Sequence, residues 1–203
     1  MIPIKVLVPS GVLGLGFDLE ALNNGVKNNP DIISIDGGST DSGPYSLGSG
    51  TSKYSRAAIK AEWKSLMIAR EKANVPLVIG SCGTCGTNGM VDWMENITIE
   101  LAEELNQNIK IAKLYCQQEK NFIKKNFQLS KIFPLNPAPM LNDQLIEEMT
   151  NIVALAGAEQ IQECINTGAE IILAGRTTDT AIISALPLMK GANPGSSWHG
   201  AKV

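Results

Sequence analysis

Histidine is almost absent from this sequence. The 203 residues contain only His199, four residues from the C-terminus. A metal site built from two histidines of this chain is therefore impossible, and a Ser-His-acid triad could use only His199. The groups left for chemistry are carboxylates, hydroxyls, thiols and backbone amides.

Long apolar runs, basic stripes and signs of a disulfide framework are also missing. The longest apolar candidate, residues 181–189, is shorter than a membrane span and contains Pro187. The net charge is −3 and the basic residues are dispersed, which argues against a nucleic-acid partner. Four scattered cysteines and an N-terminus without signal-peptide features predict a cytoplasmic protein that has no membrane partner.

A repeated pattern of apolar run, polar loop and helix predicts the fold. The apolar runs are residues 4–8, 32–35, 77–79, 109–114 and 171–174. They predict an α/β protein with a mostly parallel, doubly wound, Rossmann-like sheet of about five strands and helices on both faces. We expect residues 1–203 to form a single α/β domain. We also expect it to be the N-terminal part of a longer protein, because Trp198-His199 begins an element close to the chain end.

Several local patterns predict where helices begin and end. Asp18 and Ser55 are expected to cap helices, as is Asn142 or Asp143. The last of these helices should turn Leu145, Ile146, Met149, Ile152 and Val153 inward. Residues 131–135 are expected to form either an extra strand or an irregular crossing.

The first loop, residues 10–16, is rich in glycine and follows the first strand. Glycines let the backbone approach a ligand, so Ser10, Gly11 and Gly14 are candidate binding residues. The loop matches neither the G-x-G-x-x-G pattern nor a P-loop. The alternative is a tight turn without a ligand.

The second loop, residues 36–53, is the most unusual stretch. Asp36 and Asp41 are candidate catalytic carboxylates that could transfer a proton, position a substrate or bind a cation. Gly38, Ser39 and Thr40 are candidate ligand-binding residues between them. The alternative is an Asp-rich turn that satisfies its own amides.

The remaining loops supply further candidates. The loop at residues 81–89 offers Ser81 and Gly83, with Cys82 and Cys85 in C-x-x-C spacing. A zinc site would lack ligands without a second such pair, so we favour small residues in a ligand loop over redox or metal use. Glu119 is a candidate acid or base, and a solvated helix carboxylate is the alternative.

After the fifth strand, Arg176, Thr177 and Asp179 could hold an anion at a helix start. Alternatively, they cap the helix and pair Arg176 with an internal carboxylate. Because carboxyl ends of parallel strands share one edge of a sheet, we expect one crevice to gather the polar loop residues. These are Ser10, Gly11, Asp36, Ser39, Asp41, Ser81 and Arg176.

Four motifs resemble those of the acyclic terpene utilisation AtuA family: residues 8–14 (VPSGVLG), 36–45 (DGGSTDSGPY), 174–179 (AGRTTD) and Trp198-His199. Family members carry small residues at the positions of Cys82 and Cys85 and are about twice as long as this chain. The family name implies bacterial catabolism of citronellol-like acids, a pathway that handles them as coenzyme A thioesters.

The resemblance favours an enzyme acting on a small carboxylate or acyl thioester, as a hydratase or lyase. Asp36, Asp41 or Glu119 would move protons, while loop amides and Arg176 hold an anionic group. One alternative is a non-catalytic ligand-binding or assembly subunit of a larger complex, and another is a metal-dependent hydrolase using the paired aspartates. The expected partners are an anionic small molecule and either a second copy or another subunit. The sequence identifies no cofactor and no metal.

Overall fold

The computed structural model describes residues 3–39, 43–138 and 140–203. Within them, one fully parallel sheet has the strand order β1-β2-β3-β5-β4. The strands are β1 (Val6–Leu7), β2 (Ile32–Asp36), β3 (Leu77–Gly80), β4 (Ile111–Leu114) and β5 (Ile171–Ala174). The predicted α/β fold is confirmed, and all five expected runs became strands.

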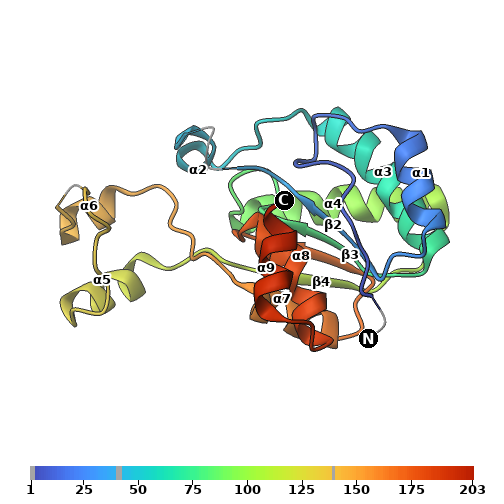
Figure 1. Ribbon diagram of the computed structural model, residues 1–203. Coiled ribbons are helices and arrows are strands. Elements are labelled where there is room, and N and C mark those ends of the chain that lie inside the picture. Colours follow the sequence, from blue (N-terminus) through green and yellow to red (C-terminus); the bar gives the residue numbers. More distant parts are fainter. Residues whose placement is uncertain (1–2, 40–42, 139) are drawn as a thin grey trace.

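Helices cover both faces of the sheet (Figure 1). On one face lie α1 (Leu19–Lys27), α3 (Arg56–Ala73) and α4 (Asn88–Leu105); on the other lie α7 (Ala158–Asn166) and α8 (Asp179–Met189), with α9 (Pro194–Lys202) packed on α8. The alternation of strand side chains explains this arrangement. In β2, Ile33 and Ile35 join the core under the first set of helices, whereas Ile32 joins the core under the second.

Three further helices lie outside these layers. The short α2 (Tyr45–Ser49) follows β2, while α5 (Lys120–Gln128) and α6 (Asp143–Glu148) belong to the connection between β4 and β5. In Figure 1, α5 and α6 project together away from the body of the molecule. We call residues 119–148, apart from 139, the arm.

Local capping follows the sequence at most helix starts. The side chains of Asp18, Ser55 and Asn142 accept hydrogen bonds from amides in the first turns of α1, α3 and α6. At α8 the cap is Thr178, whose hydroxyl accepts from the Ala181 amide, so Asp179 is the first helical residue and not the cap.

The structure corrects the predicted length of the helix after Asn142 and decides between the two alternatives for residues 131–135. The helix that begins after Asn142 ends at Glu148 and does not reach Val153. Ile152 and Val153 instead run alongside the chain after β4, where the Gln118 amide donates to the Ile152 carbonyl at 2.8 Å. Residues 131–135 form neither strand nor helix, so they are the irregular crossing.

Candidate functional site

The crevice between β3 and β5 is where this topology would ordinarily hold a ligand. The chain leaves β3 toward α4 on one face and leaves β5 toward α8 on the other, and such switch points bind ligands in open α/β sheets. Here the protein itself fills the crevice. The Ser81 amide donates to the Gly175 carbonyl at 2.8 Å, and the Ser81 hydroxyl donates to the Thr177 carbonyl at 3.1 Å.

The β3 loop is held in an unusual backbone conformation. Ser81 and Thr84 have φ values of +47° and +71°, which residues other than glycine rarely adopt. The Thr84 amide donates to Gly37 at 3.1 Å, and the Cys82 amide donates to Ala174 at 3.0 Å. These hydrogen bonds hold the loop after β3 in place beside the end of β2.

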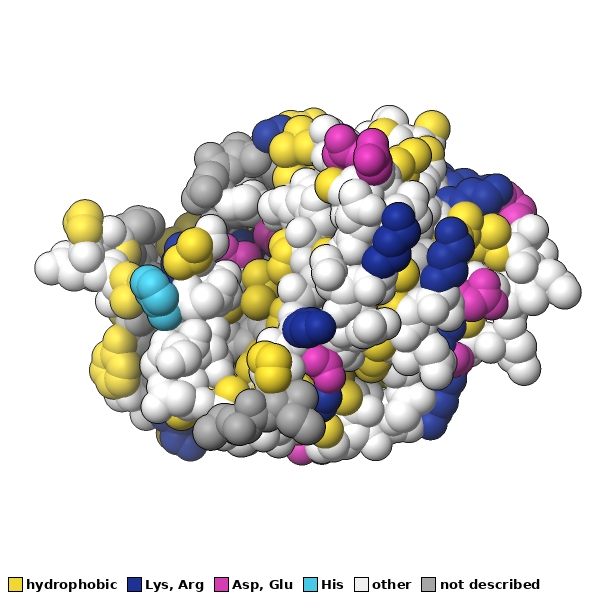
Figure 2. Space-filling model, turned by 45° about the vertical axis from the view of Figure 1, so that its right-hand side comes forward, with side chains coloured by type: hydrophobic (Ala, Val, Ile, Leu, Met, Phe, Trp, Pro, Cys, Tyr) yellow, Lys and Arg dark blue, Asp and Glu magenta, His cyan; other side chains and the backbone are white. Residues whose placement is uncertain are grey.

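The open space lies one strand further along, between β1 and β2 on one side and α8 and α9 on the other. It is a cavity of 930 Å³, within the usual range for small-molecule sites. Figure 2 shows a hollow beside the single histidine in which apolar and acidic side chains are visible. The apolar walls include Ile4, Val6, Val8, Ile182 and Ile183.

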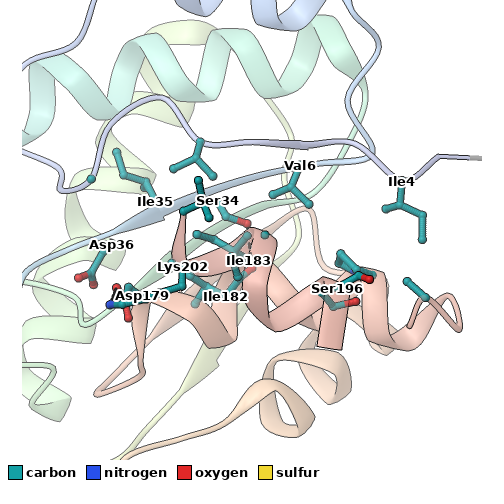
Figure 3. A pocket seen from close by; sticks show the side chains of 18 of the residues that line it. Ile4, Val6, Ser34, Ile35, Asp36, Asp179, Ile182, Ile183, Ser196 and Lys202 are labelled. Atoms are coloured by element: carbon teal, nitrogen blue, oxygen red, sulfur yellow. Dashed lines mark hydrogen bonds and ion pairs between the residues drawn. The ribbon is translucent and has the colours of Figure 1, made fainter. Parts of the chain in front are cut away.

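The polar end of this cavity lies at the carboxyl edge of the sheet. Figure 3 shows Asp36, Asp179 and Lys202 together there, with Ile4 and Ser196 toward the other end. Ser10 and Gly11 also line the cavity. Lys202 of α9 pairs with Asp179 of α8 at 3.1 Å, and both side chains are largely exposed.

Asp36 is the buried carboxylate of this site. As the last residue of β2 it faces the same side of the sheet as Ser34, whose hydroxyl donates to the Ile182 carbonyl of α8. Asp36 is only 9% exposed, and its Oδ1 atom is buried and has no hydrogen-bond partner among the described residues. Such an atom calls for an explanation, and a functional role is one.

The surroundings of Asp36 raise its pKa to about 6. Burial is the main cause, since it disfavours the charged form, and the charge of Asp179 acts in the same direction. The Gly38 and Gly37 amides and the charge of Arg176 lower the pKa, but they do not outweigh burial. A carboxyl with this pKa can both accept and release a proton near neutral pH.

Gly80 and Thr177 pack together next to Asp36, although neither lines the cavity. Gly80 is the register partner of Asp36 on β3, and a Cβ atom at Gly80 would collide with the Thr177 hydroxyl. The Thr177 Oγ1 atom is buried and, like Asp36 Oδ1, has no hydrogen-bond partner within the described residues. Sequence reasoning did not find Gly80, because a glycine at a strand end carries no signal of its own.

Arg176 lies beside the cavity without lining it. Its Nη1 donates to the Thr84 carbonyl at 3.3 Å and to the Gly38 carbonyl at 3.5 Å. Within the described residues, the guanidinium has no ion pair with a carboxylate, so the expected alternative of internal pairing is not seen there. The guanidinium therefore ties the loops after β2 and β3 together and sets a positive charge near Asp36.

The first loop divides into two parts. Ser10 and Gly11 reach the cavity, whereas Gly14 faces Tyr54, which precedes α3 and whose ring a Cβ atom at Gly14 would meet. The Gly14 and Gly16 amides donate to the Glu62 carboxylate at 2.7 and 2.9 Å. The protein's own carboxylate thus occupies the amides that we expected to meet a ligand.

The other predicted residues are placed in three ways. Gly38 and Gly83 are packed against Thr84 and Met90, and Ser39 follows Gly38 at a half-buried position. Thr40 and Asp41 lie outside the described residues. Glu119 is exposed at the start of α5 and lines a separate 310 Å³ cavity, so the structure does not bring it to Asp36.

The cysteines lie inside the protein as free thiols. Burial, together with the nearby charge of Asp36, raises the pKa of Cys82, and burial also raises that of Cys116. A thiolate is therefore disfavoured at both positions. Among the residues that the structure describes, no cluster of three or more His, Cys, Asp or Glu could hold a metal ion.

Fold and site together define a doubly wound α/β protein with a cavity at the carboxyl edge of its sheet. The model of the acyclic terpene utilisation family protein AtuA matches residues 46–190, and the chain belongs to this family. The resemblance seen in the sequence is thereby confirmed. No curated protein and no solved structure matched the chain. In the described parts of the chain, no helix is long and apolar enough to cross a membrane.

Proposed function

We propose that the cavity binds a small carboxylate or an acyl thioester and that Asp36 exchanges a proton with it, in a hydratase or lyase reaction. The observation that carries this proposal is the buried Asp36, with a pKa of about 6, at the polar end of an apolar cavity. Apolar walls suit an acyl chain, and a polar end suits its carbonyl or carboxylate. The family name, which refers to acyclic terpene utilisation, agrees with a substrate of this class.

The proposed chemistry needs a single proton carrier near the substrate. In a hydration, Asp36 accepts a proton from water while the water oxygen bonds to the β-carbon, and a proton is then delivered to the α-carbon. Elimination is the same sequence in reverse. Burial assists because a carboxylate with a pKa near 6 is a stronger base than one with its ordinary pKa.

Positive charge near the carboxyl edge would hold the anionic part of the substrate. Within the described residues, Arg176 makes its two carbonyl contacts through Nη1, and its other guanidinium N–H groups would be the donors to a carboxylate or an enolate oxygen. Lys202 is a second cation at this end and lies directly on the cavity. The first-loop residues Ser10 and Gly11 complete this polar end.

The test combines binding and exchange on the purified chain. Coenzyme A thioesters of branched β-hydroxy and α,β-unsaturated acids, the free acids and coenzyme A alone are compared by calorimetry. Deuterium incorporation at the α-carbon in heavy water, followed by mass spectrometry, reports proton transfer. We expect binding and incorporation in the wild type, and binding without incorporation in Asp36→Asn.

The control variant is Asp31→Asn, which changes a carboxylate just before the start of β2 and should leave incorporation unchanged. Equal binding by wild type and Asp36→Asn, with no incorporation in either, would support the non-catalytic binding subunit instead. Incorporation that survives in Asp36→Asn would remove Asp36 from the mechanism.

A further inference from the structure

We propose that the arm is the surface through which two copies of this chain pair, by two-fold packing of their α5–α6 hairpins. The arm is a structural unit of its own. Lys124 pairs with Glu147, the Gln128 side chain donates to Asp143 at 2.8 Å, and Ile146 is fully buried. Figure 1 shows the two helices projecting together from the body of the molecule, where a second copy can reach them.

The arm exposes several large apolar side chains. Phe133, Leu135 and Met140 are 75%, 88% and 86% exposed, and Phe122 of α5 and Leu129 just after it are more than half exposed. No residue of α5 is buried. Five large, exposed apolar side chains on one protruding element favour an interaction site over ordinary surface.

The exposed area is close to what a stable dimer needs. A large aromatic side chain buries about 150–250 Å² at an interface. Two such aromatic side chains, Phe122 and Phe133, together with two leucines and one methionine can supply much of the roughly 800 Å² per partner that a specific interface buries. A two-fold axis brings the same patch of both copies together, so each side chain meets an apolar surface.

Charge complementarity favours a second copy over other partners. Lys124 and Glu147 already pair within the arm, but residues 119–131 also carry Lys120, Lys125 and Lys131 against Glu119, and α6 also carries Asp143 and Glu148 and no base. With α5 of one copy against α6 of the other, opposite charges face each other across the axis. The arm as a whole has as many carboxylates as lysines, which gives an anionic membrane or a nucleic acid little to attract.

The first experiment measures the mass of the full chain by light scattering and sedimentation over a range of concentrations. We expect a dimer for the wild type and a monomer for the double variant Phe133→Ser/Leu135→Ser, with the dissociation constant raised at least about 30-fold. The matched control, Leu15→Ser/Leu19→Ser, changes two exposed leucines outside the arm and should stay dimeric. Circular dichroism and melting temperature verify that each variant is folded.

A charge exchange tests the pairing of α5 with α6. Lys125→Glu/Lys131→Glu and Glu148→Lys should each weaken the dimer, and a mixture of the two chains should recover it as a mixed pair. A wild type that is monomeric throughout, or a dimer that survives the serine variant, would overturn the proposal. Arm-dependent binding to phosphatidylserine vesicles by a monomer would equally overturn it and would assign the arm to a membrane.

Discussion

The buried carboxylate of Asp36 serves the proposed chemistry but lowers the stability of the protein when it is ionised. Burial raises its pKa from 3.8 to about 6, so the stability that this group contributes is complete below pH 3.8 and is lost as the pH rises through 6. Asp36→Asn should therefore raise the free energy of unfolding at pH 8 by about 1–3 kcal/mol and change it little near pH 4. Urea denaturation at the two pH values measures this difference.

Asp31, the residue just before β2, supplies a control of opposite sign. A hydrogen bond from Lys190 lowers the pKa of Asp31, so its contribution is present at neutral pH and is lost as the pH falls. Asp31→Asn should accordingly lower stability at pH 8. If Asp36→Asn also proved less stable than the wild type at pH 8, the raised pKa of Asp36 would be wrong.

Arg176 tests whether a guanidinium serves the ligand or only the fold. If it anchors an anionic group, Arg176→Lys should lose about 1.5–3 kcal/mol of binding, or one to two powers of ten in affinity, because Lys cannot reproduce the forked geometry. If it only ties Gly38 to Thr84, the variant should melt earlier and bind as before. Calorimetry and thermal melting of the same sample separate the two outcomes, and unchanged affinity in a folded variant ends the anchoring hypothesis.

At the scale of elements, the first loop is organised by a carboxylate from α3. Glu62 accepts hydrogen bonds from the Gly14 and Gly16 amides, and bonds to a charged group contribute about 1.5–3 kcal/mol each when buried. Since this loop is partly exposed, Glu62→Ala should cost about 1–2 kcal/mol. Hydrogen exchange at residues 13–17 should accelerate. Glu103→Ala, which removes an exposed carboxylate of α4, should do neither.

The contact between β3 and the start of α8 depends on Gly80. An alanine methyl group there would collide with the Thr177 hydroxyl and press on Ile182, so Gly80→Ala should lower stability by about 1–3 kcal/mol. Gly200→Ala is the matched control, because open space surrounds that glycine of α9. It should gain about 0.5–1 kcal/mol from helix propensity. A Gly80→Ala variant as stable as the wild type in thermal melting would show that Thr177 can move aside.

For the whole molecule, the arm should open far more readily than the body. No residue of α5 is buried, whereas α3 buries six, among them Trp63 and Leu66. Amide exchange in α5 should therefore be much faster than in α3 at low protein concentration. If two arms pair, exchange in α5 should slow as the concentration rises, while exchange in α3 stays unchanged. Equal protection of both helices in dilute protein would contradict this reading of the arm.

Much of the fold could be predicted because its signals are local. Each strand is an apolar run of the right length, and Asp18 and Ser55 cap helices by contacts within their own first turns. The segment around Ile152 was predicted wrongly as helix for the same reason. Its apolar spacing favours a helix, but pairing with Gln118, which is distant in the sequence, makes it extended.

The candidate site was predictable only in part. Ser10, Gly11 and Asp36 meet at one cavity, as expected from strands that share a carboxyl edge. Ser81 and Gly14 do not join them. The Ser81 hydroxyl bonds to the Thr177 carbonyl in the closed β3–β5 crevice, and the Gly14 amide bonds to Glu62. The direction of a loop side chain depends on the helix that packs above it. The spacing of residues in the sequence does not predict that packing.

By itself, the sequence determined that this chain forms a parallel sheet with polar loops at one edge, because strand periodicity and helix capping depend on residues that are neighbours in the chain. Only the tertiary structure decided the strand order and the closing of the β3–β5 crevice by backbone hydrogen bonds. It also decided that the cavity opens beside β1, with Lys202 at its rim. These features arise from contacts between residues far apart in the chain, which form only when the helices pack on the sheet.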